Sequence, residues 1–289
     1  MGLSALGAVR LLLRAGAVPF VTDSGAGRPE LCDALLSLGV GFETGGHGED
    51  VFDADLLVLS PGVPPGIGPV VAAREQGVPV VGELELASWF CGAKILAVTG
   101  TNGKTTTTAL LHAMIAGCGH AVALAGNNEM PLSEAVLGEM PPAYVVAEVS
   151  SYALESVDRF RPWCACVLNV TPDHLGRHGT MEHYAAVKGR IFSRQGEGDV
   201  AVLNGDDPYA AVMWVEDGEI VANGDAVARV EDTLLPGRHN LANVLAAVAM
   251  ARACGFDWPG VLAGLRGFGG VAHRIERVAE LDGVAYYND

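Results

Sequence analysis

The six residues GTNGKT, numbers 100 to 105, have the composition and spacing of a loop that binds phosphate. They lie between an apolar stretch that predicts a buried strand and a stretch that predicts a helix, which is the setting that such a loop requires. The first N–H groups of a helix lack helical partners and attract anions, Lys104 would add a positive charge, and the Thr105 hydroxyl is a candidate Mg²⁺ ligand. The alternative is a glycine-rich turn that only caps a helix. The sequence thus predicts an ATP site formed by Gly100, Thr101, Asn102, Gly103, Lys104, Thr105 and Thr106.

Glu148 ends a second apolar stretch, AYVVAEV at 143–149, where the carboxyl end of a parallel strand would lie. Because Mg²⁺ takes one or two protein carboxylates together with substrate oxygens, Glu148 is a candidate metal ligand near the nucleotide. Taken by itself, a glutamate at the end of a strand is more often solvated or caps a helix.

Three histidines follow a third apolar stretch, in NVTPDHLGRHGTMEHYAAVKGRIF at 169–192. The spacing of His174, His178 and His183 does not match a helical zinc motif such as H-E-x-x-H, so it does not predict zinc. A single loop histidine is usually structural or solvated. Their density at the end of a predicted strand favours an active-site loop.

A predicted helix begins near His239, and Asn240 and Asn243 lie on one face of it, one turn apart. An asparagine at the start of a helix can be only an N-cap. The residues NGDDP at 204–208 have the composition of a turn.

The elements that must position these residues alternate between helix and strand along the chain. Apolar periodicity predicts helices at 4–15, 30–38, 69–76, 83–90, 104–115, 181–193, 239–253 and 259–265. It predicts strands at 18–22, 55–59, 78–81, 94–100, 121–124, 143–149, 163–169, 199–203, 275–280 and 284–287. The alternation predicts an α/β fold with two domains. Residues 1–91 would form a Rossmann-like domain whose first strand is missing, and residues 92–289 a P-loop ATPase domain with a mostly parallel sheet and helices on both faces.

Composition narrows the choice of partners. The 289 residues are 50% apolar and 18% charged, as in folded globular proteins. There are 34 acidic and 18 basic side chains, and the formal charge of −16 disfavours a nucleic-acid partner. An anionic ligand would therefore be bound by backbone amides and one or two well-placed cations.

Neither the cysteines nor the N-terminal stretch indicates export. The six cysteines contain no C-x-x-C pair and no disulfide-framework spacing, so we expect them to be reduced, with Cys164 and Cys166 on one face of a strand. Arg10 and Arg14 interrupt the apolar N-terminal stretch, and no run approaches the ~20 apolar residues that span a bilayer. We expect a cytoplasmic protein without a membrane partner.

The order and spacing of five features resemble the Mur ligase family, which extends the peptide of peptidoglycan. They are GTNGKT, SSYAL at 150–154, NVTPDHL at 169–175, Lys188 and GRHNLAN at 237–243. The resemblance covers nearly all of the chain. Within the family it is to the branch that adds D-glutamate, through DLLVLSPGVPPG at 55–66, VVGELEL at 80–86, AGN at 125–127 and the terminal YND. It implies an ATP-dependent, ADP-forming ligase, with a UDP-binding first domain, that joins D-glutamate to UDP-N-acetylmuramoyl-L-alanine through an acyl phosphate; we expect a monomer.

The resemblance also assigns catalytic and metal-binding roles. Lys104 and Thr105 would hold the triphosphate and one Mg²⁺, with Glu148 as a further ligand, and His174 would bind a second metal that also contacts the substrate. Lys188 matches a lysine that the family carries carbamylated, which turns a cation into a carboxylate-like metal ligand. Without the resemblance, Lys188 would be interpreted as a lysine on a helix surface.

The remaining implied roles concern substrate and nucleotide. The residues implied to contact the UDP-linked substrate are Ser60, Pro61, Gly62, Asn127, Ser150 and His174. Those implied to bind the adenine, ribose or phosphates of ATP are Asn240, Asn243, Arg274 and Asp289.

The sequence departs from the family pattern at three places on the substrate side. Ala153 replaces a glutamine, Asn128 and Glu129 replace an isoleucine and a glycine, and Gly176 replaces an aspartate. We therefore expect the ATP site to follow the family more closely than the substrate site. The strand before Gly2 and the C-terminal domain that helps to bind the amino acid are also missing, so we expect this chain to be a poor or inactive ligase by itself.

Two alternatives stay open at this point. One is a sister enzyme, another Mur ligase or a folylpolyglutamate-type ligase, although the SPG segment at 60–62 and the terminal Asn-Asp argue against it. The other is a catalytically inactive nucleotide-binding or regulatory module, which the missing domain and the altered SSYAL segment favour somewhat.

Overall fold

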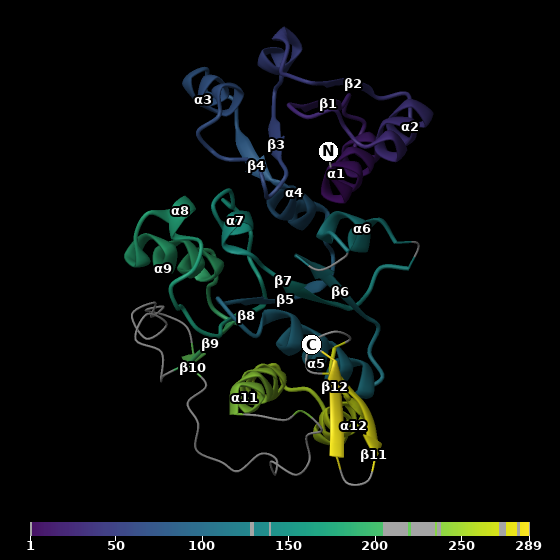
Figure 1. Cartoon of the computed structure of the whole chain (residues 1–289), viewed down its shortest axis with the longest axis vertical. Helices are drawn as coiled ribbons and strands as arrows, with labels where there is room; N and C mark the ends of the chain where they lie inside the picture. The colour runs from purple at the N-terminus through teal and green to yellow at the C-terminus, as the bar shows by residue number, and fades with distance from the viewer. Residues whose placement is uncertain are drawn as a thin grey trace. The chain divides into compact units, whose positions relative to one another are not determined.

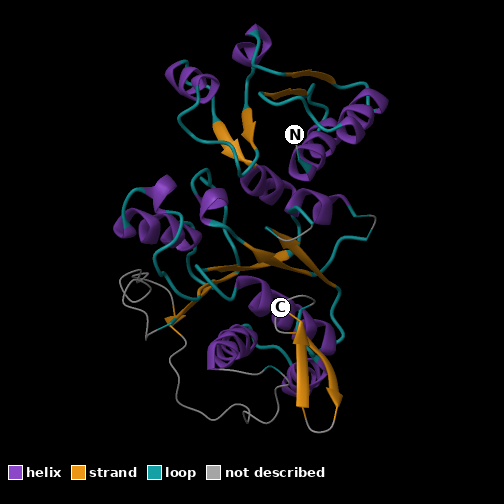
Figure 2. Cartoon of the chain, viewed as in Figure 1, coloured by secondary structure: helices purple, strands orange, loops and turns teal. Residues whose placement is uncertain are grey.

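The computed structural model describes residues 2–127, 130–138, 140–204, 219–220, 235, 238–271, 276–281 and 284–288. They divide into two compact units, whose helices and strands are drawn in Figures 1 and 2. The first unit comprises Met1–Gly92, Glu129–Pro141 and Tyr152–Phe160, and the second comprises Ala93–Asn128, Pro142–Ser151 and Arg161–Asp289. Within the described ranges, no helix is both long and apolar enough to cross a membrane.

The first unit alternates helices with short parallel strand pairs. Its helices are α1 (Leu3–Arg14), α2 (Pro29–Ser37), the 3₁₀ turn η1 (Glu49–Asp53), α3 (Gly68–Glu75) and α4 (Glu83–Phe90). Strand β1 (Phe20–Asp23) pairs with β2 (Gly41–Thr44), and β3 (Leu57–Leu59) pairs with β4 (Val80–Gly82). Strand β2 was not predicted, because its four residues GFET are too few for an alternating pattern to be recognised.

Two later segments of the chain pack within the first unit. Helix α6 (Leu132–Leu137) packs against α1 and α4, where Arg10 and Glu134 form an ion pair of 2.9 Å and the Ser133 N–H donates to Glu83 Oε1 at 2.7 Å. Residues 152–160, which begin within the short helix α7 (Ser151–Leu154), are held by the buried carboxylate of Glu85. These long-range contacts have no signature in the local sequence.

The second unit is built on a parallel sheet, which confirms the predicted fold class. The sheet order is β10 (Glu219–Ile220), β9 (Val200–Leu203), β8 (Cys164–Val167), β5 (Lys94–Thr99), β7 (Tyr144–Glu148) and β6 (Val122–Gly126). Each neighbouring pair is parallel. Because β5 lies between β7 and β8, the residues that follow these three strands meet at one edge of the sheet.

The remaining elements of the second unit are helices and a separate hairpin. The helices are α5 (Lys104–Gly117), α8 (Leu175–His178), α9 (Met181–Gly189), the 3₁₀ turn η2 (Arg190–Phe192), α11 (Arg238–Ala253) and α12 (Trp258–Gly267). The predicted terminal strands are present as β11 (Glu276–Leu281) and β12 (Val284–Asn288), which pair with each other in an antiparallel hairpin.

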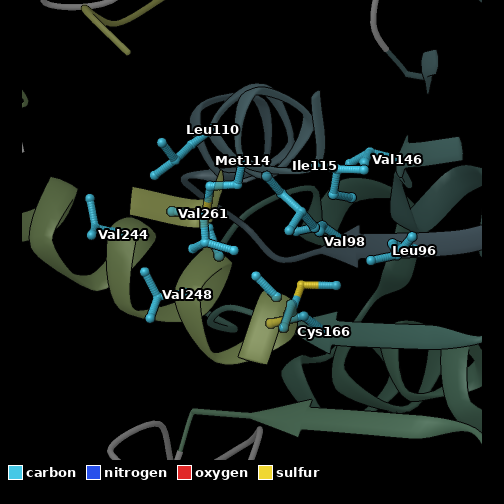
Figure 3. Packing of buried hydrophobic residues seen from close by; sticks show 14 of the residues in the cluster. Leu96, Val98, Leu110, Met114, Ile115, Val146, Cys166, Val244, Val248 and Val261 are labelled. Carbon is cyan, nitrogen blue, oxygen red and sulfur yellow. The ribbon is translucent and has the colours of Figure 1, made fainter. Parts of the chain in front are cut away.

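The main hydrophobic core lies between the sheet and helices α5, α11 and α12 (Figure 3). Leu96 from the sheet, Met114 from α5, Val248 from α11 and Val261 from α12 belong to one buried cluster. Cys164 and Cys166 are both buried in this cluster, which confirms that they share a face of β8, and all six cysteines are free thiols. The core therefore fixes α5, and with it the loop that precedes α5, against the sheet.

Candidate nucleotide and metal site

The predicted phosphate loop spans the turn from β5 into α5. Gly103 is the residue before the helix, and its φ of 84° lies in the left-handed region that favours glycine. A Cβ at Gly103 would collide with the side-chain amide of Asn243. Helix α5 has no side-chain cap, and Thr105 and Thr106 lie in its first turn. The start of this 14-residue helix therefore offers backbone N–H groups to an anion.

Two lysines point at one carbonyl of this loop. Lys104 Nζ donates to Gly100 O at 3.0 Å and to Thr101 O at 2.8 Å, and Lys188 Nζ donates to Gly100 O at 2.8 Å. The interpretation of Lys188 as a surface lysine is wrong, because its side chain is only 1% exposed. Burial and, to a smaller extent, the neighbouring charge of Lys104 lower the pKa of Lys188 to about 7, and Asp173 partly opposes this shift. A large fraction of the Lys188 amine is therefore neutral near pH 7.

Glu148 is buried at the carboxyl end of β7, so the interpretation as a solvated glutamate is wrong. Its Oε1 accepts a hydrogen bond from Asn127 Nδ2 at 3.3 Å, which places Asn127 beside this carboxylate. Its Oε2 is buried and has no hydrogen-bond partner among the described residues. A buried carboxylate oxygen without a partner costs free energy, and a cation would supply the missing interaction.

A metal ion at this edge of the sheet would take few of its ligands from protein carboxylates. The described residues contain no group of three or more His, Cys, Asp or Glu side chains that could hold a metal. Glu148 could therefore contribute one ligand, with the remainder from a hydroxyl such as that of Thr105, from phosphate oxygens or from a modified lysine. The unpartnered Oε2 of Glu148 fits a hard cation such as Mg²⁺ in that setting.

The three histidines have different environments. His174, with a φ of 52°, precedes α8, is partly exposed, and has its Nε2 3.4 Å from Asp173 Oδ2. His178 is buried, and its Nε2 lies 3.0 Å from Ser151 Oγ. The backbone N–H of His183 donates to Thr180 Oγ1, the cap of α9. Of the three, His178 is buried, whereas His174 and His183 are exposed.

Tyr184 connects the loop, the buried lysine and two of the histidines, and it was not among the predicted site residues. Its hydroxyl is 3.3 Å from Thr101 Oγ1, and its ring lies 4.5 Å from Lys188 Nζ. The ring centroids of His174 and His178 lie 6.4 Å and 4.9 Å from that of Tyr184. The available signal was the i, i+4 spacing of Tyr184 and Lys188, which puts both on one face of α9.

Asn240 and Asn243 are buried next to the loop. Helix α11 begins at Arg238, so the interpretation of Asn240 as an N-cap is wrong. Asn243 Nδ2 donates to Asn240 Oδ1 at 3.3 Å, and Asn243 lies against Gly103. Asn243 therefore lies beside the phosphate loop, and Asn240 lies beside Asn243.

The remaining predicted residues are placed as follows. Ser60, Pro61 and Gly62 form a turn after β3 in the first unit, where the Val63 N–H donates to Ser60 O. Ser150 follows β7 in the second unit. The positions that lie outside the described residues are Arg274, Asp289, Asn128, Glu129 and 205–208 of the NGDDP turn.

Two family models match the chain. The Mur ligase middle domain matches residues 98–223, and the Mur ligase MurD-like N-terminal domain matches residues 1–82. A UDP-N-acetylmuramoylalanine--D-glutamate ligase from Pelotomaculum thermopropionicum is 46% identical, with 100% of this chain and 70% of the relative covered. The ligase of the same name from Chlorobaculum tepidum is 41% identical, with 100% and 71% covered.

Solved structures show the same fold at lower identity. A murein peptide ligase from Psychrobacter arcticus has a TM-score of 0.60 and 17% identity, and 100% of this chain and 71% of that chain are covered. The UDP-N-acetylmuramate-alanine ligase from Thermotoga maritima has a TM-score of 0.56 and 22% identity, with 100% and 72% covered.

Proposed function

The chain belongs to the Mur ligase family, and we propose that it works as an ATP-dependent ligase that adds D-glutamate to UDP-N-acetylmuramoyl-L-alanine in peptidoglycan precursor synthesis. Relatives named as UDP-N-acetylmuramoylalanine--D-glutamate ligase are 46% and 41% identical over the whole chain. The observation that carries the proposal within the structure is the junction of the phosphate loop, the buried Lys188 and the half-satisfied Glu148 at one edge of the parallel sheet.

The reaction forms an amide and is driven by ATP. The carboxylate of the UDP-linked substrate attacks the γ-phosphorus of ATP, so ADP leaves and an acyl phosphate forms. The amine of D-glutamate then attacks the acyl carbon, phosphate leaves, and the amine loses a proton. Neither step needs a nucleophile from the protein, so alignment of the reactants and charge stabilisation supply most of the rate.

The loop residues provide charge stabilisation around the triphosphate. The first N–H groups of α5 and the Lys104 ammonium are positive groups at the same place. Lys104 donates to loop carbonyls at Gly100 and Thr101, and its flexible stem would allow it to turn to the β- and γ-phosphates. We propose Asn240 and Asn243 for the adenine end, and Arg274 and Asp289 for phosphates and ribose.

We further propose that two Mg²⁺ ions neutralise the oxygens of the triphosphate and the substrate carboxylate. Thr105 and Glu148 would hold one ion, and His174 would hold the other. Lys188, as a carbamate, would be a further metal ligand. A pKa of about 7 supports this modification, because only the neutral amine reacts with CO₂ and a usual lysine has little of it at neutral pH.

The proposed substrate residues are those that the family resemblance implies. We propose that Ser60, Pro61, Gly62, Asn127, Ser150 and His174 contact the UDP-linked substrate. The proposed domains are a UDP-substrate-binding domain at 1–91 and an ATP-binding domain at 92–289. We also propose a cytoplasmic monomer without a nucleic-acid or membrane partner; the formal charge of −16 supports the exclusion of nucleic acid.

Phosphate release tests this function. Full-length protein is incubated with ATP, Mg²⁺ and UDP-N-acetylmuramoyl-L-alanine, with and without D-glutamate. We expect release that depends on D-glutamate. Release that is independent of it, or dependent on a different amino acid, would point to the sister ligases, and ATP binding without any release would point to an inactive nucleotide-binding module.

A further inference from the structure

We propose that Asn169 is a positioning residue of the ATP site, which holds the phosphate loop so that the start of α5 is presented to the triphosphate. This inference rests on the proposed function as an ATP-dependent ligase. Asn169 lies two residues after β8 and is not among the residues that the family resemblance assigned to the site.

The Asn169 side chain binds the loop backbone through both ends of its amide. Its Oδ1 accepts from the N–H of Thr101 at 3.1 Å and from the N–H of Asn102 at 2.9 Å. Its Nδ2 donates to Asn102 O at 3.1 Å. Its main-chain oxygen also accepts from the Thr101 N–H at 3.0 Å. One residue therefore holds three successive peptide groups of the loop.

Asn169 is itself held on both sides. Before it, the Leu168 N–H donates to Thr99 O at 2.9 Å, which continues the pairing of β8 with β5. After it, the Thr171 N–H donates to Thr101 Oγ1 at 3.0 Å, and the same hydroxyl donates to Thr171 O at 3.2 Å. The side chain is thus presented from a rigid strand end and not from a free loop.

These contacts divide the loop into two parts. The amides of Thr101 and Asn102 are directed at Asn169, so binding of phosphate falls to the amides from the left-handed Gly103 onward. The position at which the chain turns into Gly103 depends on where Asn102 is held. A loop that is ordered before ATP arrives loses less conformational entropy on binding, which favours affinity.

Three variants separate this role from a general contribution to folding. Asn169→Ala removes all three side-chain hydrogen bonds. Asn169→Asp keeps the acceptor for both amides, but loses the donor to Asn102 O and adds a negative charge near the triphosphate. Asn204→Ala is the matched control, because the Asn204 side chain donates to Leu168 O at 2.9 Å and so ties β9 to the residue beside Asn169.

The measurements are hydrogen exchange of the Thr101 and Asn102 amides without nucleotide, the Kd for ATP by calorimetry, and KM and kcat in the ligase reaction. For Asn169→Ala we expect loss of protection at the Asn102 amide and a smaller loss at the Thr101 amide, which keeps its bond to the main-chain oxygen of residue 169. We expect a Kd for ATP roughly 10- to 100-fold higher, with KM affected more than kcat. For Asn169→Asp we expect retained protection and weakened ATP binding. For Asn204→Ala we expect retained protection and a Kd within about 3-fold of wild type.

Wild-type protection and ATP affinity in Asn169→Ala would overturn the proposal, and so would an equal loss in Asn204→Ala. Thermal unfolding shows whether Asn169→Ala folds. If it does not, Asn169→Asp is the test: protected amides with weakened ATP binding support the proposal, and loss of protection at both amides overturns it. A wild-type protein that binds no ATP would contradict the proposed function instead, while amide exchange would still show whether Asn169 holds the loop.

Discussion

Two buried glutamates, one in each unit, have opposite surroundings. Both oxygens of Glu85 are satisfied by the protein: Oε1 accepts from Trp89 Nε1 and the Arg159 N–H, and Oε2 accepts from the N–H groups of Asp158 and Phe160, all within 2.9 Å. Glu148 has one bond of 3.3 Å on Oε1 and none among the described residues on Oε2. A carboxylate completed by backbone amides serves the fold, whereas one that is left incomplete inside the protein is where a ligand is expected.

The largest effect that we expect from this contrast is a loss of ligase activity when Glu148 is substituted. Glu148→Gln removes the negative charge beside the phosphate loop while keeping the shape of the side chain. We expect D-glutamate-dependent phosphate release to fall roughly 100-fold or more, because metal-ion stabilisation of the reacting oxygens supplies several kcal/mol. We expect the free energy of unfolding in urea to be unchanged or higher. A stable variant with near wild-type activity would contradict the assignment.

At Glu85 we expect a substitution to lower the stability of the fold. Glu85→Ala leaves three backbone N–H groups and the Trp89 indole without their acceptor, and each unsatisfied buried donor costs ~1–3 kcal/mol. We expect a loss of about 3–5 kcal/mol in the free energy of unfolding, measured in urea. Glu85→Gln, whose single amide oxygen keeps two of the four acceptor contacts, is the control and should lose less. A change below ~1 kcal/mol in the alanine variant would remove the structural role.

The charge at Lys188 sharpens the comparison, because a carbamate there would place a second anion in the region of Glu148. Since the pKa of Lys188 is about 7, the amine is mostly neutral at pH 8 and mostly charged at pH 6. With ¹³C-labelled bicarbonate, we expect a carbamate NMR signal that is present at pH 8 and decreases toward pH 6. Lys188→Met should abolish this signal, and a signal that persists in the variant would assign it to another group.

The smallest expected effect concerns Glu83, whose hydrogen bonding is intermediate between that of Glu85 and that of Glu148. It is buried, it accepts one backbone N–H, and burial raises its pKa above the usual value of 4.5. The folded protein therefore holds this proton more tightly than the unfolded chain, so the stability that Glu83 contributes is present at low pH and decreases as the pH rises. Relative to wild type, Glu83→Gln should become more stable as the pH increases from 4 to 7, by less than the change at Glu85. Urea unfolding at several pH values measures this, and a pH-independent difference would contradict it.

Much of the fold could be predicted from local pattern. Each predicted helix and strand has a counterpart in the structure, since apolar periodicity records which face of an element is buried. The short elements β2, η1, α6, α7, α8 and β10 were not predicted. They contain two to six residues, which is too few for a period to be recognised, and α6 owes its place to contacts with α1 and α4.

The sequence by itself determined the α/β class, the phosphate loop and the family, because these depend on local pattern and on the order of motifs. Only the tertiary structure decided that Lys188 is buried on the Gly100 carbonyl, that Glu148 keeps an unpartnered oxygen while Glu85 is complete, and that Asn169 holds the loop. The physical reason is that pKa values, burial and hydrogen-bond satisfaction depend on neighbours that are distant in the chain. Strand order, with β5 placed between β7 and β8, brings those neighbours together.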